Sequence, residues 1–138
     1  MKIIYNSLIP FSGFFAINLF GTLFIRNEYK NKIISKSIIN HESIHSEQYK
    51  DLIYIFFLPL YLLEWIIKIP FSWFYEKKQN GKIIKNIAYY SISFEQEAYY
   101  NENDLDYIKN RKKFSWVKYI FKMYDPNKVI KQYYEKNY

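Results

Sequence analysis

The sequence predicts an α+β domain in which helices predominate and a short strand or hairpin lies near the N-terminus. Its 138 residues suffice for one domain with a buried core. Half of the residues are hydrophobic and 22% are aromatic, which excludes a disordered chain. A β-branched and aromatic run near the N-terminus precedes segments with helical spacing. Cysteine is absent, so disulfides and thiolate metal ligands are excluded.

Residues 16–26 are β-branched and aromatic, with Gly21 at a position that suits a turn or bulge. We expect a strand or short hairpin there. The segment before it is apolar after Lys2 and so resembles a secretory signal. However, Pro10 and Gly13 interrupt the run and no small-residue cleavage site follows. We therefore expect these residues to belong to the fold, with no cleavable signal peptide and a cytoplasmic or inner-membrane-associated protein.

A helix is predicted near residues 36–51, with Ser35 or Ser37 as its N-cap. It carries His41-Glu42-x-x-His45, which contains the only two histidines of the chain. Four residues apart on a helix, both imidazoles share a face and can reach one zinc ion at about 2.0–2.1 Å. Glu42 can then hold a metal-bound water. The alternative is a surface helix with two solvated histidines.

Residues 52–67 form the most apolar segment, and Pro59 predicts a kink or break in a helix there. Glu64 and Lys68 have the spacing of an ion pair on one helix. The run is shorter than a typical membrane span, which favours a buried core helix. Because Trp65 lies near the end of this segment and further aromatic residues follow it, a membrane-embedded or interfacial segment and a partner-binding helix stay open.

A second helix is predicted near residues 93–110, after a polar loop with a turn signal at Asn80-Gly81. Ser93 and Gln96 match a capping box, and a buried stripe is expected along Phe94, Ala98, Leu105 and Ile108. A catalytic zinc usually takes three protein ligands. Without cysteine or another histidine, the third must be a carboxylate, and Glu95 and Glu97 are both candidates. Either could instead be an ordinary first-turn glutamate.

His41-Glu42-x-x-His45 followed by Glu95-x-x-Ala98 resembles the gluzincin zinc metalloproteases. The resemblance implies a zincin-like active-site helix facing a glutamate helix, with Glu95 as the third zinc ligand and Ala98 as a small residue at their contact. Tyr99 stands where membrane-associated members have an aspartate. The gluzincin resemblance also implies that a strand beside the active-site helix binds extended substrate, and residues 16–26 are the candidate for this strand. Three further strings are Gly-Phe-x-Ala-Ile-Asn-Leu-Phe-Gly, Asn-His-Glu-x-Ile-His and Ser-Phe-Glu-x-Glu-Ala-Tyr. Through them the chain also resembles, over about residues 8–120, a family of short, uncharacterised bacterial proteins.

The whole net charge of +7 resides in residues 109–138, because residues 1–108 carry equal numbers of basic and acidic groups. Apolar residues recur in this tail at helical spacing, from Phe114 to Tyr124, and Asp125-Pro126 predicts the start of another helix. Two packing helices with solvated lysines are one interpretation. Attachment to an anionic membrane surface is another, whereas nucleic acid is disfavoured because no recognition motif accompanies the charge.

Together these features predict a single zincin-like domain over residues 1–138 that binds Zn²⁺ through His41, His45 and Glu95. The expected activity is hydrolysis of peptide bonds in a peptide or protein substrate, with Glu42 as the catalytic base that takes a proton from water and passes it to the leaving amine. Two alternatives stay open. The first is a non-catalytic zinc-binding or assembly protein with a degenerate protease fold. The second is a membrane-associated interaction protein without a metal.

Overall fold

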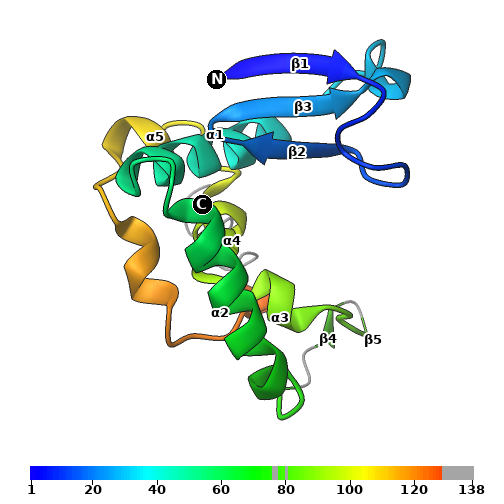
Figure 1. The fold of residues 1–138 in the computed structure, drawn as a ribbon. Helices are drawn as coiled ribbons and strands as arrows, with labels where there is room; N and C mark the ends of the chain where they lie inside the picture. Colours follow the sequence, from blue (N-terminus) through cyan, green and yellow to red (C-terminus); the bar gives the residue numbers. More distant parts are fainter. Residues whose placement is uncertain (76–77, 80, 129–138) are drawn as a thin grey trace, which may run out of the picture.

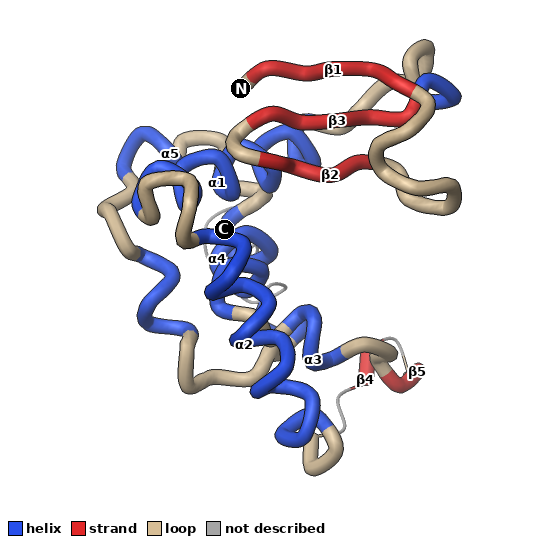
Figure 2. The backbone as a smooth tube through the Cα atoms, in the orientation of Figure 1, coloured by secondary structure: helices blue, strands red, loops and turns tan. Residues whose placement is uncertain are grey.

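The computed structural model describes residues 1–75, 78–79 and 81–128. A small sheet lies at one end of the molecule, and the helices extend away from it (Figure 1 and Figure 2). The helix-dominated α+β class is therefore as predicted. In chain order the elements are β1 (Lys2–Asn6), β2 (Ala16–Leu19), β3 (Thr22–Arg26), η1 (Asn27–Tyr29), α1 (Lys36–Asp51), α2 (Phe57–Ser72), β4 (Lys78–Gln79), β5 (Lys82–Ile83), α3 (Ile87–Tyr90), α4 (Ser93–Asn101), α5 (Tyr107–Asn110) and η2 (Ser115–Tyr119).

The sheet has the strand order β1-β3-β2, with β1 parallel and β2 antiparallel to β3. The predicted hairpin is confirmed. Phe20 and Gly21 join its strands at φ values of 52° and 80°, the left-handed region that a tight two-residue hairpin turn requires. Leu23 and Ile25 of β3 are fully buried, and β2 lies against α1. Strand β1 was not predicted. It leaves β2 as one edge of the sheet, next to the histidine helix.

Helix α1 begins and ends where the sequence predicts. The Ser35 hydroxyl accepts a hydrogen bond from the Ile38 amide at 3.2 Å, so Ser35 is the N-cap. The helix ends at Asp51, and the two following positive-φ residues, Ile53 and Tyr54, prevent its continuation. Its buried face carries polar as well as apolar side chains, and Ile44 and Tyr49 are fully buried.

The predicted helix over 93–110 is wrong in its length and its cap. Helix α4 ends at Asn101, because the Asn40 side chain of α1 donates to the carbonyls of Asn101, Glu102 and Asp104 at 2.9–3.2 Å. The expected capping box is absent, and Ile92 is the N-cap. Phe94 and Ala98 are buried as predicted, whereas Leu105 is exposed in the turn before α5.

The N-terminus of α4 is held by the Glu64 carboxylate of α2 instead of its own serine. Glu64 accepts hydrogen bonds from the amide and the hydroxyl of Ser93 at 2.7 and 2.6 Å. A carboxylate is favourable there because it satisfies free N–H groups and complements the helix dipole. The Gln96 amide, freed from the capping role, donates to the carbonyls of Ser91 and Lys122.

The apolar segment 52–67 is mostly not in the core. Pro59 does not break a helix, because it lies in the first turn of α2, where a proline is tolerated. The predicted pair of Glu64 and Lys68 is present at 3.7 Å. Within α2, only Phe57 and Lys68 are buried. Among the described residues, none of the helices has both the length and the apolar character needed to cross a bilayer.

The tail begins as a 3-10 helix, η2, instead of the expected α-helix. Its Trp116 and Tyr119 are buried, as is Tyr124, whereas Phe121 is almost fully exposed. The Asp125 carboxylate accepts a hydrogen bond from the Asn127 amide at 3.0 Å, as expected for a cap. The rest of the predicted final helix, from residue 129 onward, lies outside the described residues.

A buried ion network connects α1, α4 and the segment after α5. Arg111 donates to Glu97 at 2.6 and 3.1 Å and to Asp51 at 2.7 Å, and all three side chains are at most 3% exposed.

We expect Arg111→Met to lower the free energy of unfolding by about 3–5 kcal/mol, because two buried carboxylates lose their cation. Urea unfolding measures this loss. Lys109 is an exposed neighbour in the chain, and Lys109→Met should lower the free energy of unfolding by less than about 0.5 kcal/mol. An equal loss of stability in both variants would contradict the role of the network.

Candidate metal centre

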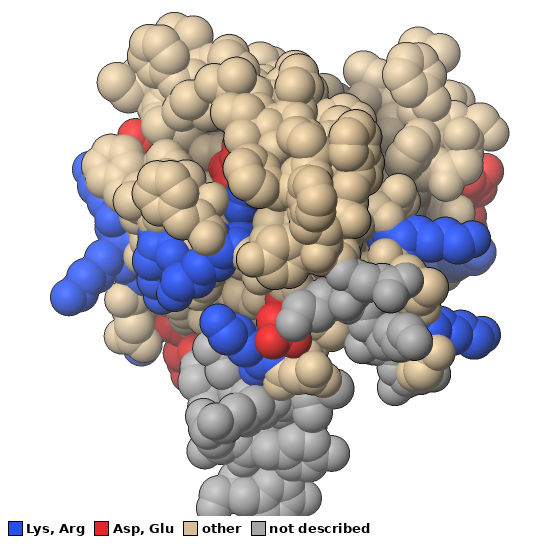
Figure 3. Space-filling model, turned by 90° about the horizontal axis from the view of Figure 1, so that it is seen from below, with Lys and Arg blue, Asp and Glu red and all other residues tan. Residues whose placement is uncertain are grey.

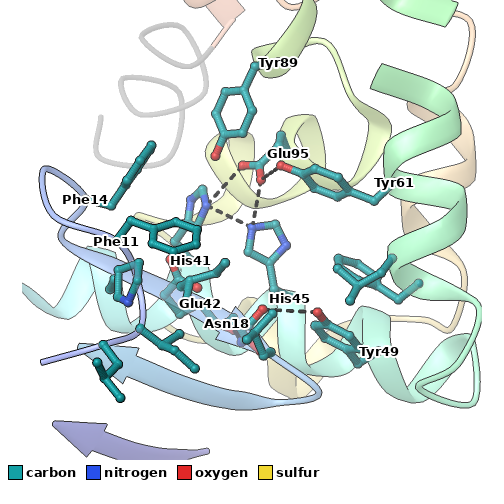
Figure 4. A pocket seen from close by; sticks show the side chains of 18 residues that line it. Phe11, Phe14, Asn18, His41, Glu42, His45, Tyr49, Tyr61, Tyr89 and Glu95 are labelled. Atoms are coloured by element: carbon teal, nitrogen blue, oxygen red, sulfur yellow. Dashed lines mark hydrogen bonds and ion pairs between the residues drawn. The ribbon is translucent and has the colours of Figure 1, made fainter. Parts of the chain in front are cut away.

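His41 and His45 lie one turn apart on the buried face of α1. Their Nε2 atoms face each other at 3.1 Å, and the residues are 7% and 6% exposed. The Asn18 side chain helps to position this turn of α1, because its amide donates to the Glu42 carbonyl at 2.8 Å and to the Ser46 hydroxyl at 3.0 Å. The shared helical face that the spacing predicts is therefore present (Figure 4).

Glu95 completes the cluster from α4. Its carboxylate oxygens lie 3.4 Å from His41 Nε2 and 3.4 Å from His45 Nε2, and the residue is 3% exposed. The three predicted ligands thus offer atoms that all lie within 4.8 Å of one another. Glu97, the other candidate, is bound instead by Arg111 and by Gln48, which donates to it at 2.9 Å. The structure therefore brings Glu95 and not Glu97 to the histidines.

The other ring nitrogen of each histidine has an acceptor. His41 Nδ1 lies 2.9 Å from a Glu102 carboxylate oxygen, and His45 Nδ1 lies 2.7 Å from Gln48 Oε1. The Gln48 amide is oriented by its own donations to the Phe94 carbonyl and the Glu97 carboxylate, so its oxygen faces the imidazole. Both Nδ1 atoms therefore carry a proton, and both Nε2 atoms point into the cluster. Ligating histidines are oriented in this way in metalloproteins.

The cluster fits a divalent cation. The two Nε2 atoms lie 3.1 Å apart, and the buried Glu95 Oε2 has no hydrogen-bond partner among the described residues. In a tetrahedral zinc site, bonds of about 2.0–2.1 Å place ligand atoms about 3.3–3.4 Å apart, close to the separations found here. Two imidazoles and one carboxylate also form the donor set of zinc sites that keep an open position.

The cluster binds protons tightly when no metal is present. Burial lowers the pKa of His41, but Glu102 and Glu95 outweigh it and raise that pKa to about 10. Burial also opposes protonation of His45, while Glu95 raises its pKa. Burial raises the pKa of Glu95, but the two histidines outweigh this effect and hold it well below its usual range. A metal ion would displace these protons, since it needs the same lone pairs.

A cavity of about 570 Å³ opens next to the cluster. His41, Glu42, His45 and Glu95 form its polar end, and Figure 4 shows the Glu42 side chain beside the histidines. Burial raises the pKa of Glu42, with His45 and His41 opposing. Most of the remaining lining is apolar and comes from the loop before β2, from β2 itself and from the first turn of α2: Leu8, Ile9, Pro10, Phe11, Phe14, Ala16, Ile17, Leu19, Phe57 and Leu58.

Two tyrosine hydroxyls belong to the same cavity. The Tyr61 hydroxyl of α2 donates to Glu95 Oε1 at 2.7 Å, and Tyr89 of α3 lies beside it (Figure 4). Burial is the main cause of the raised pKa of both tyrosines, so both stay neutral donors. Neither was predicted. Tyr61 lies in the apolar segment 52–67, which is predicted from the sequence to be a core or membrane helix, so its hydroxyl gave no signal of a role in the site.

Sequence reasoning also missed the residues that orient the histidines. Tyr99, which stands where the gluzincin pattern has an aspartate, packs its ring against His41 with 4.5 Å between centroids. The carboxylate that accepts from the His41 ring is that of Glu102, three residues after Tyr99. Glu102 lies seven residues after Glu95, or two helical turns, and this spacing was the available signal. Gln48 follows His45 by three residues, which places both on one face.

No family model, curated protein or solved structure matches this chain. The assignment of the site therefore depends on its geometry.

We expect Glu102→Ala to weaken zinc binding about 10–100-fold, because His41 loses the acceptor that orients its Nε2 toward the cluster. Competition with a chromophoric chelator measures the affinity. Asp106→Ala removes an exposed carboxylate from the same region and should leave the affinity unchanged. Equal zinc affinity in the two variants would show that Glu102 does not support the site.

Proposed function

We propose that this protein is a zinc-dependent metallopeptidase with a gluzincin-like site. The observation that carries the proposal is the convergence of His41, His45 and Glu95 at the polar end of a cavity that Glu42 also lines. His41, His45 and Glu95 would hold the zinc ion. Zinc in such a site supplies Lewis-acid chemistry that activates water and polarises a carbonyl.

In this proposal Glu42 is the general base. It follows His41 directly on α1, and its carboxylate faces the cavity beside the ligands without being one of them. A carboxylate there can take a proton from water and return it to the leaving amine of the substrate. The neutral Tyr89 hydroxyl at the same end is a donor for a developing negative charge on the substrate oxygen, whereas the Tyr61 hydroxyl donates to Glu95.

The open edge of β2 supports an extended peptide as the substrate. In the β2–β3 ladder, Leu19 pairs with Thr22 next to the turn, so Ala16 and Asn18 direct their backbone groups away from β3. The Asn18 carbonyl accepts a hydrogen bond from the Tyr49 hydroxyl at 3.1 Å, so the edge is open at Ala16. Ala16, Ile17, Asn18 and Leu19 all line the cavity. An extended segment can add to such an edge through main-chain hydrogen bonds. The apolar lining of the cavity favours substrates with large hydrophobic side chains near the cleaved bond.

A non-catalytic zinc-binding protein is the second candidate. The deep burial of all three ligands and the hydrogen bond from Tyr61 to Glu95 favour it, because a purely structural site is closed. The cavity beside the ligands favours the peptidase.

Glu42→Gln separates the two candidates. The peptidase predicts that this variant keeps its zinc and hydrolyses a peptide library about 10²–10⁴-fold more slowly, because the proton acceptor is lost. Zinc content is measured by elemental analysis and cleavage by mass spectrometry. Glu47→Gln is the control on the same helix; Glu47 pairs with Lys50 at 2.6 Å and should be dispensable. Zinc binding without cleavage in the unmodified protein would support the non-catalytic candidate, and full activity of Glu42→Gln would refute the mechanism.

A further inference from the structure

Helix α2 is attached to the rest of the protein along one narrow stripe. Phe57, Tyr61, Glu64 and Lys68 recur every three or four residues and so share one face. Phe57 packs in the core against Tyr49 and Phe94, and Tyr61 and Glu64 bind residues of α4. Lys68 donates to the Lys122 carbonyl at 2.7 Å. Both charged residues of the helix therefore point toward the protein.

The rest of the helix surface is apolar and exposed. It begins in the turn before α2, continues along the helix and ends in the aromatic residues after it. We call these residues the α2 face: Ile53, Ile55, Phe56, Leu60, Leu62, Leu63, Trp65, Ile66, Ile67, Phe71, Trp73 and Phe74. Ile66 is 61% exposed, Trp73 77% and Phe74 85%. A contiguous apolar surface of this extent indicates an interaction site.

The surface around the α2 face is basic. Lys82 and Lys85 precede α3, which packs against α2, and Lys118 and Lys122 lie in and after η2; all four are exposed. Seen from below the view of Figure 1, lysine and arginine side chains flank an uncharged surface (Figure 3). Within residues 1–75, 78–79 and 81–128, Glu28 and Asp106 are the only acidic residues that are exposed instead of buried or half-buried. Neither belongs to α2, α3 or η2.

We propose that the α2 face docks in the interfacial region of an anionic lipid bilayer. An apolar helix surface with flanking lysines and with tryptophans along and after it is the pattern that lies in the plane of a membrane. The lysines add attraction to anionic headgroups. A second copy of the chain fits the face less well, because docking two copies would bring their four flanking lysines together. The inference does not depend on the metal or on peptidase activity.

Leu58 connects the two surfaces, since it lies in the first turn of α2 and also lines the cavity. A molecule docked through the α2 face would hold that cavity close to the lipid surface. Phe11 and Phe14, which line the cavity on its other side, are 82% and 64% exposed. Hydrophobic segments at the membrane surface would then be within reach of the site.

Sedimentation with lipid vesicles tests the inference on the full-length protein. Vesicles of phosphatidylcholine alone are compared with vesicles that also contain about 30% phosphatidylglycerol, at low and high salt. We expect stronger binding to the anionic vesicles, weakened by salt, with tryptophan fluorescence shifted to the blue, since Trp65 and Trp73 belong to the α2 face. The double variant Ile66→Ser/Phe74→Ser should lose about tenfold or more in vesicle affinity. Both positions are exposed, so the fold should not suffer.

The control changes exposed apolar residues far along the chain from α2. Ile33 is 100% exposed and Leu105 is 57% exposed, and Ile33→Ser/Leu105→Ser should bind vesicles like the unmodified protein. Equal binding of both double variants would overturn the proposal, as would equal binding to the two kinds of vesicle. A third result would assign the α2 face to a second copy of the chain. In that case the protein binds neither kind of vesicle and forms a dimer, and Ile66→Ser/Phe74→Ser converts the dimer to monomers.

Discussion

The candidate site depends on the polar contact between α1 and α4. Asn40, His41, His45 and Gln48 recur along one face of α1 and are all buried against α4 and the residues after it. Burying such groups is costly unless each finds a partner. Asn40 binds the carbonyls at the end of α4, and Gln48 binds Phe94 and Glu97. These bonds set the register of the two helices, and that register brings Glu95 to the imidazoles.

The same contact explains why the lone pairs converge. Glu102 and Gln48 accept from the Nδ1 atoms, so each Nε2 turns toward Glu95. Arg111 binds Glu97, and Glu97 in turn orients Gln48, so the ion network extends to the candidate metal centre. On the other side, Asn18 joins β2 to α1, which brings an open strand edge to the cavity. Strand β2, helices α1 and α4 and the segment after α5 therefore each contribute to the site.

The sequence predicts the parts that depend on local pattern. The hairpin around Gly21, the start and end of α1, and the shared face of His41 and His45 follow from turn chemistry, capping and helical period. The choice between Glu95 and Glu97 depends on how α4 is rotated against α1, which periodicity does not give. Glu64 displaced the predicted capping box, and Asn40 ended α4 early, because tertiary hydrogen bonds outweighed local preferences. Composition likewise could not tell that the apolar residues of α2 stay exposed.

The tautomers of the two histidines test the central claim most directly, and the chain has no other histidine to confuse the spectrum. Long-range ¹H–¹⁵N correlation spectra of the ¹⁵N-labelled protein should show both rings protonated at Nδ1 once zinc is added. Both Nε2 resonances should then shift to values typical of metal-bound nitrogen. Rings that keep a proton at Nε2 after zinc is added, or resonances that zinc leaves unchanged, would contradict a metal centre formed by α1 and α4.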